Sequence, residues 1–485
     1  MESSSSAGWE NGEGRPFPIP ELRHIIRQEP PKGLYCPMPQ GCTTTNPLKL
    51  VASVSLFSLG AFMRQFCFSL LTLLGCSVVA FAQEATPTTN WSQFRGPNRD
   101  GVSLEKGLLK EWPKGGPELL WKTEAMGDGF SSVSVVGERI FTMGDLNGSS
   151  HLSAVDRATG KSLWQTKIGK AGGNYAGTRC TPTVDEDRVY GLGQFGDLVC
   201  LNVATGEEIW RKNMSRDFGG QSGGWNYTES PLVDGNKLVC TPGGAKQSMV
   251  ALDKTTGKLI WSSALGQAAG YSSMIVVTSG KFRQYVQLLS NEVVSVDSNN
   301  GKVLWRYGNA PGKYQSNTAN IPTPIVWMDR IYAAAGYGRG AGLVQLTASG
   351  SGVAAKEVYF NKELANKHGG AVRVENLVFS DRDDSGNPQC ADIATGKILW
   401  KRPRAESRES GRGSASMVFA DGHLYIRYDN GWVALVEANS SGYVEKGSFK
   451  IPNSSNNSWA HPVVVGGKLF LREKGALLCY NVTAK

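Results

Sequence analysis

The sequence predicts an all-β fold, an eight-bladed β-propeller whose ring closes between its N- and C-terminal strands. Three observations predict it. One eleven-residue pattern recurs along the chain, its copies are spaced like propeller blades, and the two ends of the chain carry complementary parts of one blade. The 485 residues include 59 glycines, a proportion that suits a fold with many tight turns.

The recurring pattern is clearest at residues 154–164, AVDRATGKSLW. Alternating apolar residues before the aspartate predict a strand, Thr-Gly or Asn-Gly predicts a hairpin turn, and the residues up to the tryptophan predict the next strand. We expect the aspartates to cap these turns by accepting backbone N–H groups. Further copies lie at residues 200–210, 251–261, 295–305 and 390–400.

The tryptophan spacing sets the length of the repeat. Trp164, Trp210, Trp261 and Trp305 follow one another at intervals of 44 to 51 residues, which is enough for about four short strands. The gap from Trp305 to Trp400 holds two such units. KEVYF therefore closes a degenerate blade, with Phe360 in the place of the tryptophan, and Phe449 takes that place one blade after Trp400. The expected fourth strands are centred on residues 121, 164, 210, 261, 305, 360, 400 and 449.

The two ends of the chain complete the eighth blade. PELLWKTE contains Trp121 and reads as a fourth strand with no blade before it, whereas GALLCYNVTAK stops before its own fourth strand. Pairing the two closes the ring and removes two exposed edges. We therefore assign residues 117–485 to the propeller. Residues 83–116 form an N-terminal lead-in segment, which we expect to wrap the outside or fold onto a face, anchored by Trp91 and Phe94.

Residues 63–82 have the features of a signal peptide: Arg64, an apolar run and an Ala-Phe-Ala end. We expect cleavage after Ala82 and a periplasmic or secreted mature protein without a membrane span. Residues 1–62 are then a misassigned start or a disordered extension. The alternative is a membrane anchor formed by residues 49–82, an apolar run that Arg64 interrupts.

Composition and motifs exclude several function classes. The net charge of +9 includes no concentrated basic stripe, so nucleic acid is not an expected partner. The five cysteines after residue 82 form no C-x-x-C or adjacent pair, which argues against a disulfide framework or a zinc site. No metalloprotease, nucleophile-elbow or phosphate-loop motif occurs. We therefore predict no catalytic residue and no metal ligand.

The unit A-x-D-x-x-T-G-K-x-x-W resembles the tryptophan-docking repeat of pyrroloquinoline quinone (PQQ) dehydrogenases and of PQQ-like propellers, which include the Bam-complex outer-membrane assembly lipoprotein. WSQFRGPNRDG at 91–101 resembles the lead-in of secreted PQQ-like proteins from planctomycete-type bacteria. The resemblance implies that the repeat tryptophans pack between neighbouring blades. These structural residues are Trp121, Trp164, Trp210, Trp261, Trp305 and Trp400.

Candidate ligand-binding residues lie in the loops that enter the innermost strands, where propellers carry their function. Trp225 and Trp459 stand out because sibling blades have no tryptophan there. They are either platforms for a ligand or packing that plugs the channel. The full set is Arg179, Trp225, Asn226, Glu229, Tyr271, Asn320, His368, Arg412, Trp459 and His461.

Two functions fit these features. The first is an exported, non-catalytic and monomeric propeller that binds a protein or glycan partner of the cell envelope through its inner-loop funnel, in a scaffold or assembly role. The alternative, implied by the resemblance, is a PQQ- and Ca²⁺-dependent quinoprotein oxidoreductase acting on an alcohol or sugar. Such enzymes use a catalytic aspartate and usually a vicinal disulfide, which this sequence lacks. Glu229 with Asn226 or Asn320 offers fewer oxygens than the six to eight that Ca²⁺ takes.

Overall fold

The computed structural model describes residues 90–308, 319–383, 385–403, 409–454 and 456–484. The predicted signal peptide and residues 1–62 lie outside the described residues. Within the described part of the chain, no helix combines the length and apolar character needed to cross a membrane.

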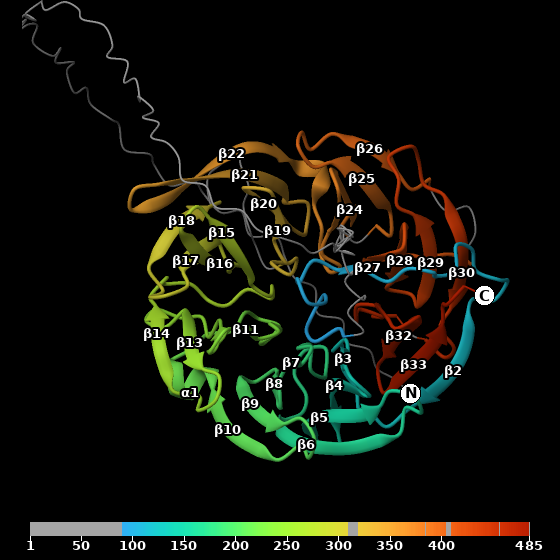
Figure 1. The fold of residues 1–485 in the computed structure, drawn as a ribbon, viewed down its shortest axis with the longest axis horizontal. Coiled ribbons are helices and arrows are strands. Elements are labelled where there is room, and N and C mark those ends of the chain that lie inside the picture. The colour runs from blue at the N-terminus through green and yellow to red at the C-terminus, as the bar shows by residue number, and fades with distance from the viewer. Residues whose placement is uncertain (1–89, 309–318, 384, 404–408, 455, 485) are drawn as a thin grey trace, which may run out of the picture. The chain divides into compact units, whose positions relative to one another are not determined.

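The predicted eight-bladed propeller is confirmed: eight antiparallel sheets follow one another around a ring (Figure 1). The first four blades are β3(Ser134–Val136), β4(Arg139–Leu146), β5(Ser149–Asp156), β6(Ser162–Lys170); β7(Thr183–Asp185), β8(Arg188–Leu192), β9(Asp197–Asn202), β10(Glu208–Asn213); β11(Leu232–Asp234), β12(Lys237–Cys240), β13(Met249–Asp253), β14(Leu259–Ser263); and β15(Ile275–Ser279), β16(Phe282–Leu288), β17(Val293–Asp297), β18(Val303–Tyr307).

The next four are β19(Ile325–Trp327), β20(Arg330–Ala335), β21(Gly340–Ser349), β22(Gly352–Asn361); β23(Val372–Val374), β24(Leu377–Asp381), β25(Pro388–Asp392), β26(Ile398–Lys401); β27(Ala415–Ala420), β28(His423–Tyr428), β29(Trp432–Glu437), β30(Glu445–Lys450); and β31(Val463–Val465), β32(Lys468–Glu473), β33(Ala476–Asn481), β2(Glu118–Thr123). A short helix α1(Met214–Phe218) follows β10, and a 3₁₀ turn η1(Lys362–Leu364) follows β22.

Ring closure takes the predicted form. Strand β2, from the start of the propeller, pairs antiparallel with β33, from its end, and Trp121 lies opposite Cys479. A bulge just before Trp121 has counterparts before Trp164, Trp261 and Trp400, so the closing strand is a true repeat strand contributed from the other end of the chain.

Neighbouring blades dock through an aromatic ring and a turn glycine. The indole N–H of Trp164 donates to the carbonyl of Val203 in the next blade at 3.2 Å. Trp210, Trp261 and Trp400 make equivalent bonds of 3.0, 3.1 and 2.8 Å. The glycine of the next turn lies flat on the ring: a Cβ added at Gly206 would lie 2.6 Å from Trp164. Only glycine allows this approach, which explains the T-G of the repeat.

The degenerate blade requires a correction of one residue. Tyr359, not Phe360, occupies the docking position, because β22 bulges so that Leu343 pairs with Tyr359. The Tyr359 hydroxyl donates to the carbonyl of Ile393 at 3.1 Å, and a Cβ at Gly396 would lie 2.4 Å from its ring. The sequence suggested Phe360 because this degenerate copy has two adjacent aromatic residues and lacks the Asp-x-x-Thr-Gly turn that sets the position of the tryptophan in the other blades.

Two smaller expectations are confirmed. The repeat aspartates cap their turns: Asp156 accepts the Thr159 N–H at 2.8 Å, and Asp253 and Asp392 do the same with a threonine three residues later. The five described cysteines are free and buried. Desolvation raises the pKa of Cys200, Cys390 and Cys479 to about 12, which keeps these thiols protonated and unreactive.

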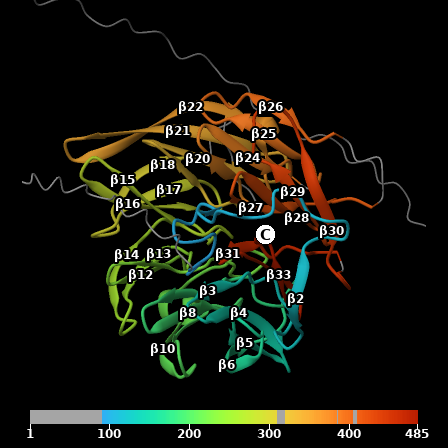
Figure 2. The ribbon, with the colours of Figure 1, turned by 45° about the vertical axis from the view of Figure 1, so that its right-hand side comes forward.

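Residues 90–103 of the lead-in segment correct another expectation. They do not wrap the outside but run along the centre of the ring (Figures 1 and 2, blue). The Trp91 N–H donates to Val135 in β3 at 2.7 Å, and Ser92 accepts the N–H of Val184 in β7. Strand β1(Val102–Ser103) then adds in parallel to the inner edge of β27. Inner strands leave backbone groups unpaired at the axis, and the lead-in satisfies them.

Two arginines fix this segment. Arg95 donates to the carbonyls of Gly369 and Ala371 at 3.3 and 2.6 Å, and Arg99 donates to Ser230, Pro231 and Met274 at 2.6–2.9 Å. Both side chains are buried. One short segment therefore ties together blades that lie far apart in the sequence.

The second part of the lead-in does reach the outer strands. The Trp112 N–H donates to the carbonyl of Lys446 in β30 at 2.8 Å, and its ring packs edge-on against Tyr425 and Phe449. Gly447 makes room for it, since an added Cβ there would lie 2.7 Å from the Trp112 Cβ. Trp112 thus fills the aromatic layer of a blade whose fourth strand has no tryptophan.

Candidate functional site

A cavity of about 140 Å³ lies at the axis of the ring, bounded by the inner loops and by the lead-in segment. Its walls are mainly aromatic, and serines and threonines line its base. The lining comprises Phe94, Arg95, Phe130, Ser132, Tyr175, Arg179, Thr181, Trp225, Thr228, Ser230, Tyr271, Ser273, Ile321, Thr323, Tyr337, Lys367, His368, Gly370, Trp459 and His461.

A belt of hydroxyl groups at the starts of the innermost strands also lines the cavity. The Thr181 hydroxyl accepts the N–H of Ser132 at 3.2 Å, the Ser230 hydroxyl accepts that of Thr181 at 3.0 Å, and Ser273 accepts that of Ser230 at 3.0 Å. The first four blades are thus bonded in sequence at the axis as well as through the outer rings. The belt gives the loops above it a fixed base.

One wall is built around Trp459. Its ring stacks on His368 with centroids 4.7 Å apart and packs against Phe130 at 4.8 Å. Tyr175 meets it edge-on at 5.2 Å. Trp459 is half-buried and Tyr175 exposed, so this wall presents ring surface at the mouth of the cavity.

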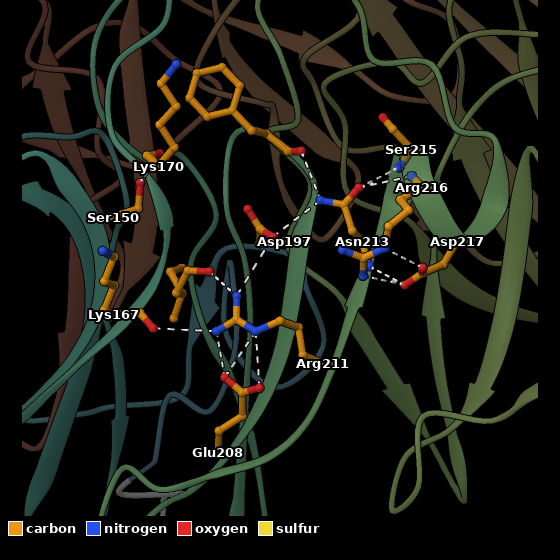
Figure 3. Close-up of polar contacts among 12 residues, drawn as sticks. Ser150, Lys167, Lys170, Asp197, Glu208, Arg211, Asn213, Ser215, Arg216 and Asp217 are labelled. Atoms are coloured by element: carbon orange, nitrogen blue, oxygen red, sulfur yellow. Dashed lines mark hydrogen bonds and ion pairs between the residues drawn. The ribbon is translucent and has the colours of Figure 1, made fainter.

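The opposite wall is built around Trp225. Its ring packs on Tyr271 at 5.1 Å and lies near Tyr337 at 6.4 Å, and its backbone N–H donates to the Tyr271 hydroxyl at 3.2 Å. Helix α1 and its flanking residues anchor the loop that carries Trp225. Asn213 caps the helix by accepting the N–H groups of Ser215 and Arg216, and also donates to Asp197 (Figure 3).

The lead-in segment forms the floor. Phe94 meets His461 edge-on at 4.9 Å, and Arg95 lies beside it. Desolvation and, to a smaller extent, the charge of Arg95 lower the pKa of His461 to about 3, so this imidazole is neutral at physiological pH.

Six of the ten candidate residues line this cavity, and four lie elsewhere. Those at the cavity are Arg179, Trp225, Tyr271, His368, Trp459 and His461. Asn320 bridges the carbonyls of Leu289 and Ser290, and Arg412 borders a separate surface depression with Asp429. Asn226 forms a left-handed turn beside Trp225.

Glu229 is buried below the loops. It accepts hydrogen bonds from the Thr241 N–H and hydroxyl at 2.8 and 3.1 Å. Desolvation raises its pKa to about 8, although these bonds and the charge of Arg99 oppose the shift. Its carboxyl group is therefore a core group, out of reach of the cavity.

The sequence-based candidates omit Arg95, Phe130, Tyr337 and Lys367, which also line the cavity. A partial signal exists for two of them. Phe130 precedes the first blade at the position of an inner loop, and Lys367 adjoins His368. No local signal indicates Arg95, whose place depends on the path of the lead-in.

The donor set does not fit a calcium-assisted quinone. Ca²⁺ requires six to eight oxygens, several of them from carboxylates. No aspartate or glutamate appears among the residues lining the cavity, and the described residues contain no cluster of three or more potential metal-binding His, Cys, Asp or Glu side chains. The lining instead offers rings, hydroxyls and cations.

Comparisons with known proteins agree with this fold. The family model described as outer membrane protein assembly factor BamB matches residues 148–402. The protein of that name from Shewanella oneidensis is 23% identical over 282 residues, which cover 54% of this chain and 66% of that protein, just under two thirds of its length. The dehydrogenase subunit of alcohol dehydrogenase (quinone) from Acetobacter aceti is 33% identical over 124 residues, 23% of this chain and 17% of that protein.

Among solved structures, BamB from Moraxella catarrhalis matches with a TM-score of 0.53 and 13% identity. The match covers 75% of this chain and 97% of that one. At this identity the likeness concerns the fold.

Proposed function

The chain belongs to the family of outer membrane protein assembly factor BamB, and on that premise we propose that it is an exported, non-catalytic scaffold of the cell envelope that binds a protein partner through the axial cavity. The names of its relatives support a role in assembly at the outer membrane. The mature protein would then act in the periplasm or outside the cell as a monomer, after cleavage behind Ala82.

One observation carries the proposal: two aromatic walls, around Trp225 and Trp459, face a single small cavity. Its volume of about 140 Å³ is below the roughly 300–1,000 Å³ of typical small-molecule sites. A cavity of this size suits one inserted side chain or sugar unit of a larger partner. Aromatic anchors in such a position supply most of the energy at protein interfaces.

The test is capture of envelope proteins by the purified chain and by its variants Trp225→Ala and Trp459→Ala. We expect both variants to lose the captured partner while their melting temperatures stay close to that of the parent. Leu163→Ala, which removes an exposed apolar side chain from the outer strand β6, is the matched control and should capture normally. Strongly lowered melting temperatures in both variants would show that these rings serve to pack the fold, and they would contradict the proposal. If the purified chain binds to a glycan array and captures no envelope protein, the ligand of the cavity is a glycan.

The quinoprotein alternative has a direct test. Titration with PQQ in the presence and absence of Ca²⁺, followed by absorbance and calorimetry, should give no Ca²⁺-dependent binding, because the described lining of the cavity offers no carboxylate ligand for the ion. Saturable binding together with dye reduction by an alcohol or sugar would overturn the scaffold proposal.

A further inference from the structure

Positive charge is concentrated around the axial cavity. Arg95 lies at its floor, and Arg179 and Lys367 lie in its walls. The Arg179 guanidinium lies 5.9 Å from the centroid of Phe130, and the Lys367 ammonium lies 4.8 Å from that of Tyr337. Among the described residues that line the cavity none is acidic, so the charges of these residues have one sign.

The two arginines are held by neutral groups. Arg179 donates to the main-chain carbonyls of Asn174 and Tyr175 at 2.5 and 2.7 Å, and Arg95 donates to carbonyls of the β23 loop and of the lead-in segment itself. In the described part of the chain, no carboxylate oxygen lies within 4 Å of either guanidinium. Carbonyl dipoles orient these groups but leave their net charge in place.

Two acids act on these arginines by their charge, Asp145 on Arg179 and Asp100 on Arg95, and both carboxylates are bonded to other groups. Asp145 accepts hydrogen bonds from the Ser150 hydroxyl, the Gln194 amide and the Gly172 N–H, and Asp100 accepts the N–H of Val102. Burial lowers the pKa of Arg95 to about 10 and lowers that of Arg179, yet both stay protonated at physiological pH. The cavity therefore has a positive electrostatic potential, and the low polarity of its surroundings strengthens it.

We infer that the cavity takes an anionic group carried on an aromatic or other planar ring, and that Arg95, Arg179 and Lys367 balance its charge in place of a divalent cation. The stacked rings supply the planar contact surface, and the cations select the charge. The inference rests on the proposed function, because it names the ligand chemistry of the same cavity. It also departs from the calcium-assisted quinone site that the family resemblance implies.

Three probes with one ring and different charges test the inference: phenylacetate, phenylacetamide and 2-phenylethylamine. Calorimetric titrations would be run with EDTA and again with excess Ca²⁺. We expect phenylacetate to bind roughly tenfold more tightly than the neutral amide, a difference of about 1.4 kcal/mol, and the amine to bind more weakly still. EDTA and Ca²⁺ should leave the affinity unchanged.

Charge variants locate the effect. Lys367→Gln and Arg179→Gln should each weaken phenylacetate binding several-fold and leave phenylacetamide binding unchanged. Lys367→Arg and Arg179→Lys retain the charge and should restore selectivity for the anion. Lys161→Gln, at an exposed outer turn, is the control. The Arg179 side chain also holds its own loop, so the Arg179 variants can fail to fold. In that case Lys367→Gln and Lys367→Arg still test the effect of charge.

Three results would overturn the inference: equal affinity for acid and amide, binding that requires Ca²⁺, or binding of none of the probes. The proposed function is tested separately by partner capture. If capture still depends on Trp225 and Trp459 while the probes show no charge selectivity, the scaffold role stands and the ligand class falls. If the probes show the expected charge selectivity and no partner is captured, the ligand class stands and the scaffold role falls.

Discussion

Glu229→Gln should remove a pH dependence of stability that originates in one buried carboxyl group. Burial raises the Glu229 pKa from 4.5 to about 8 in the folded protein. Between these values the folded state keeps a proton that the unfolded state has lost, so stability is highest below pH 4.5 and falls as the pH rises towards 8. At about 1.4 kcal/mol per unit, the loss over this window is on the order of 5 kcal/mol.

Glutamine preserves the local bonds and cannot ionise. Its carbonyl would accept the Thr241 N–H, and its amide would donate to the Thr241 hydroxyl in place of the second carboxylate oxygen. The assay is urea unfolding followed by tryptophan fluorescence from pH 5 to pH 9, for the parent, Glu229→Gln and Glu118→Gln, an exposed control on β2. Parent and Glu229→Gln should agree near pH 5 and diverge above it, with the variant more stable. A stability difference that stays constant across this range would refute the reasoning.

Two further predictions concern how the ring and the lead-in hold together. Deleting residues 477–485 removes most of β33, the partner of β2, and should abolish the cooperative thermal melt, because it opens the ring and empties the last blade; a deletion mutant that melts near the parent temperature would exclude closure as a source of stability. Trp112→Ala should lower the unfolding free energy by about 3–5 kcal/mol, as large-to-small substitutions of buried rings do. Denaturant unfolding measures this loss, and a change below about 1 kcal/mol would mean that the lead-in is not part of the packed core.

The sequence predicts the ring well because its determinants are local and repeated. A strand, a threonine-glycine turn and a tryptophan lie within eleven residues, and the same unit docks on its neighbour. The prediction fails where a contact depends on distant backbone. Arg95 and Arg99 bond to carbonyls more than 130 residues away, and carbonyls carry no residue-specific signal.

The candidate site was predictable to the same extent and for the same reason. Position before an innermost strand is enough to bring Trp225, Trp459, His368 and Tyr271 to the axis. It does not determine the direction of a side chain. Asn320 turns to bridge two carbonyls, and Glu229 points into the core, because loop backbone there has unpaired groups that a nearby side chain must satisfy.

The path of the lead-in connects stability and the proposed function. Propellers of this size leave a space at the axis, and here residues 91–103 occupy part of it while Phe94 and Arg95 line the cavity. A partner can then insert one group into a positively charged cavity whose walls are rings. Because the blades are held at their outer strands by docked rings and at the axis by the hydroxyl belt, Trp225 and Trp459 are not required for blade docking. Their removal should therefore affect binding before it affects folding.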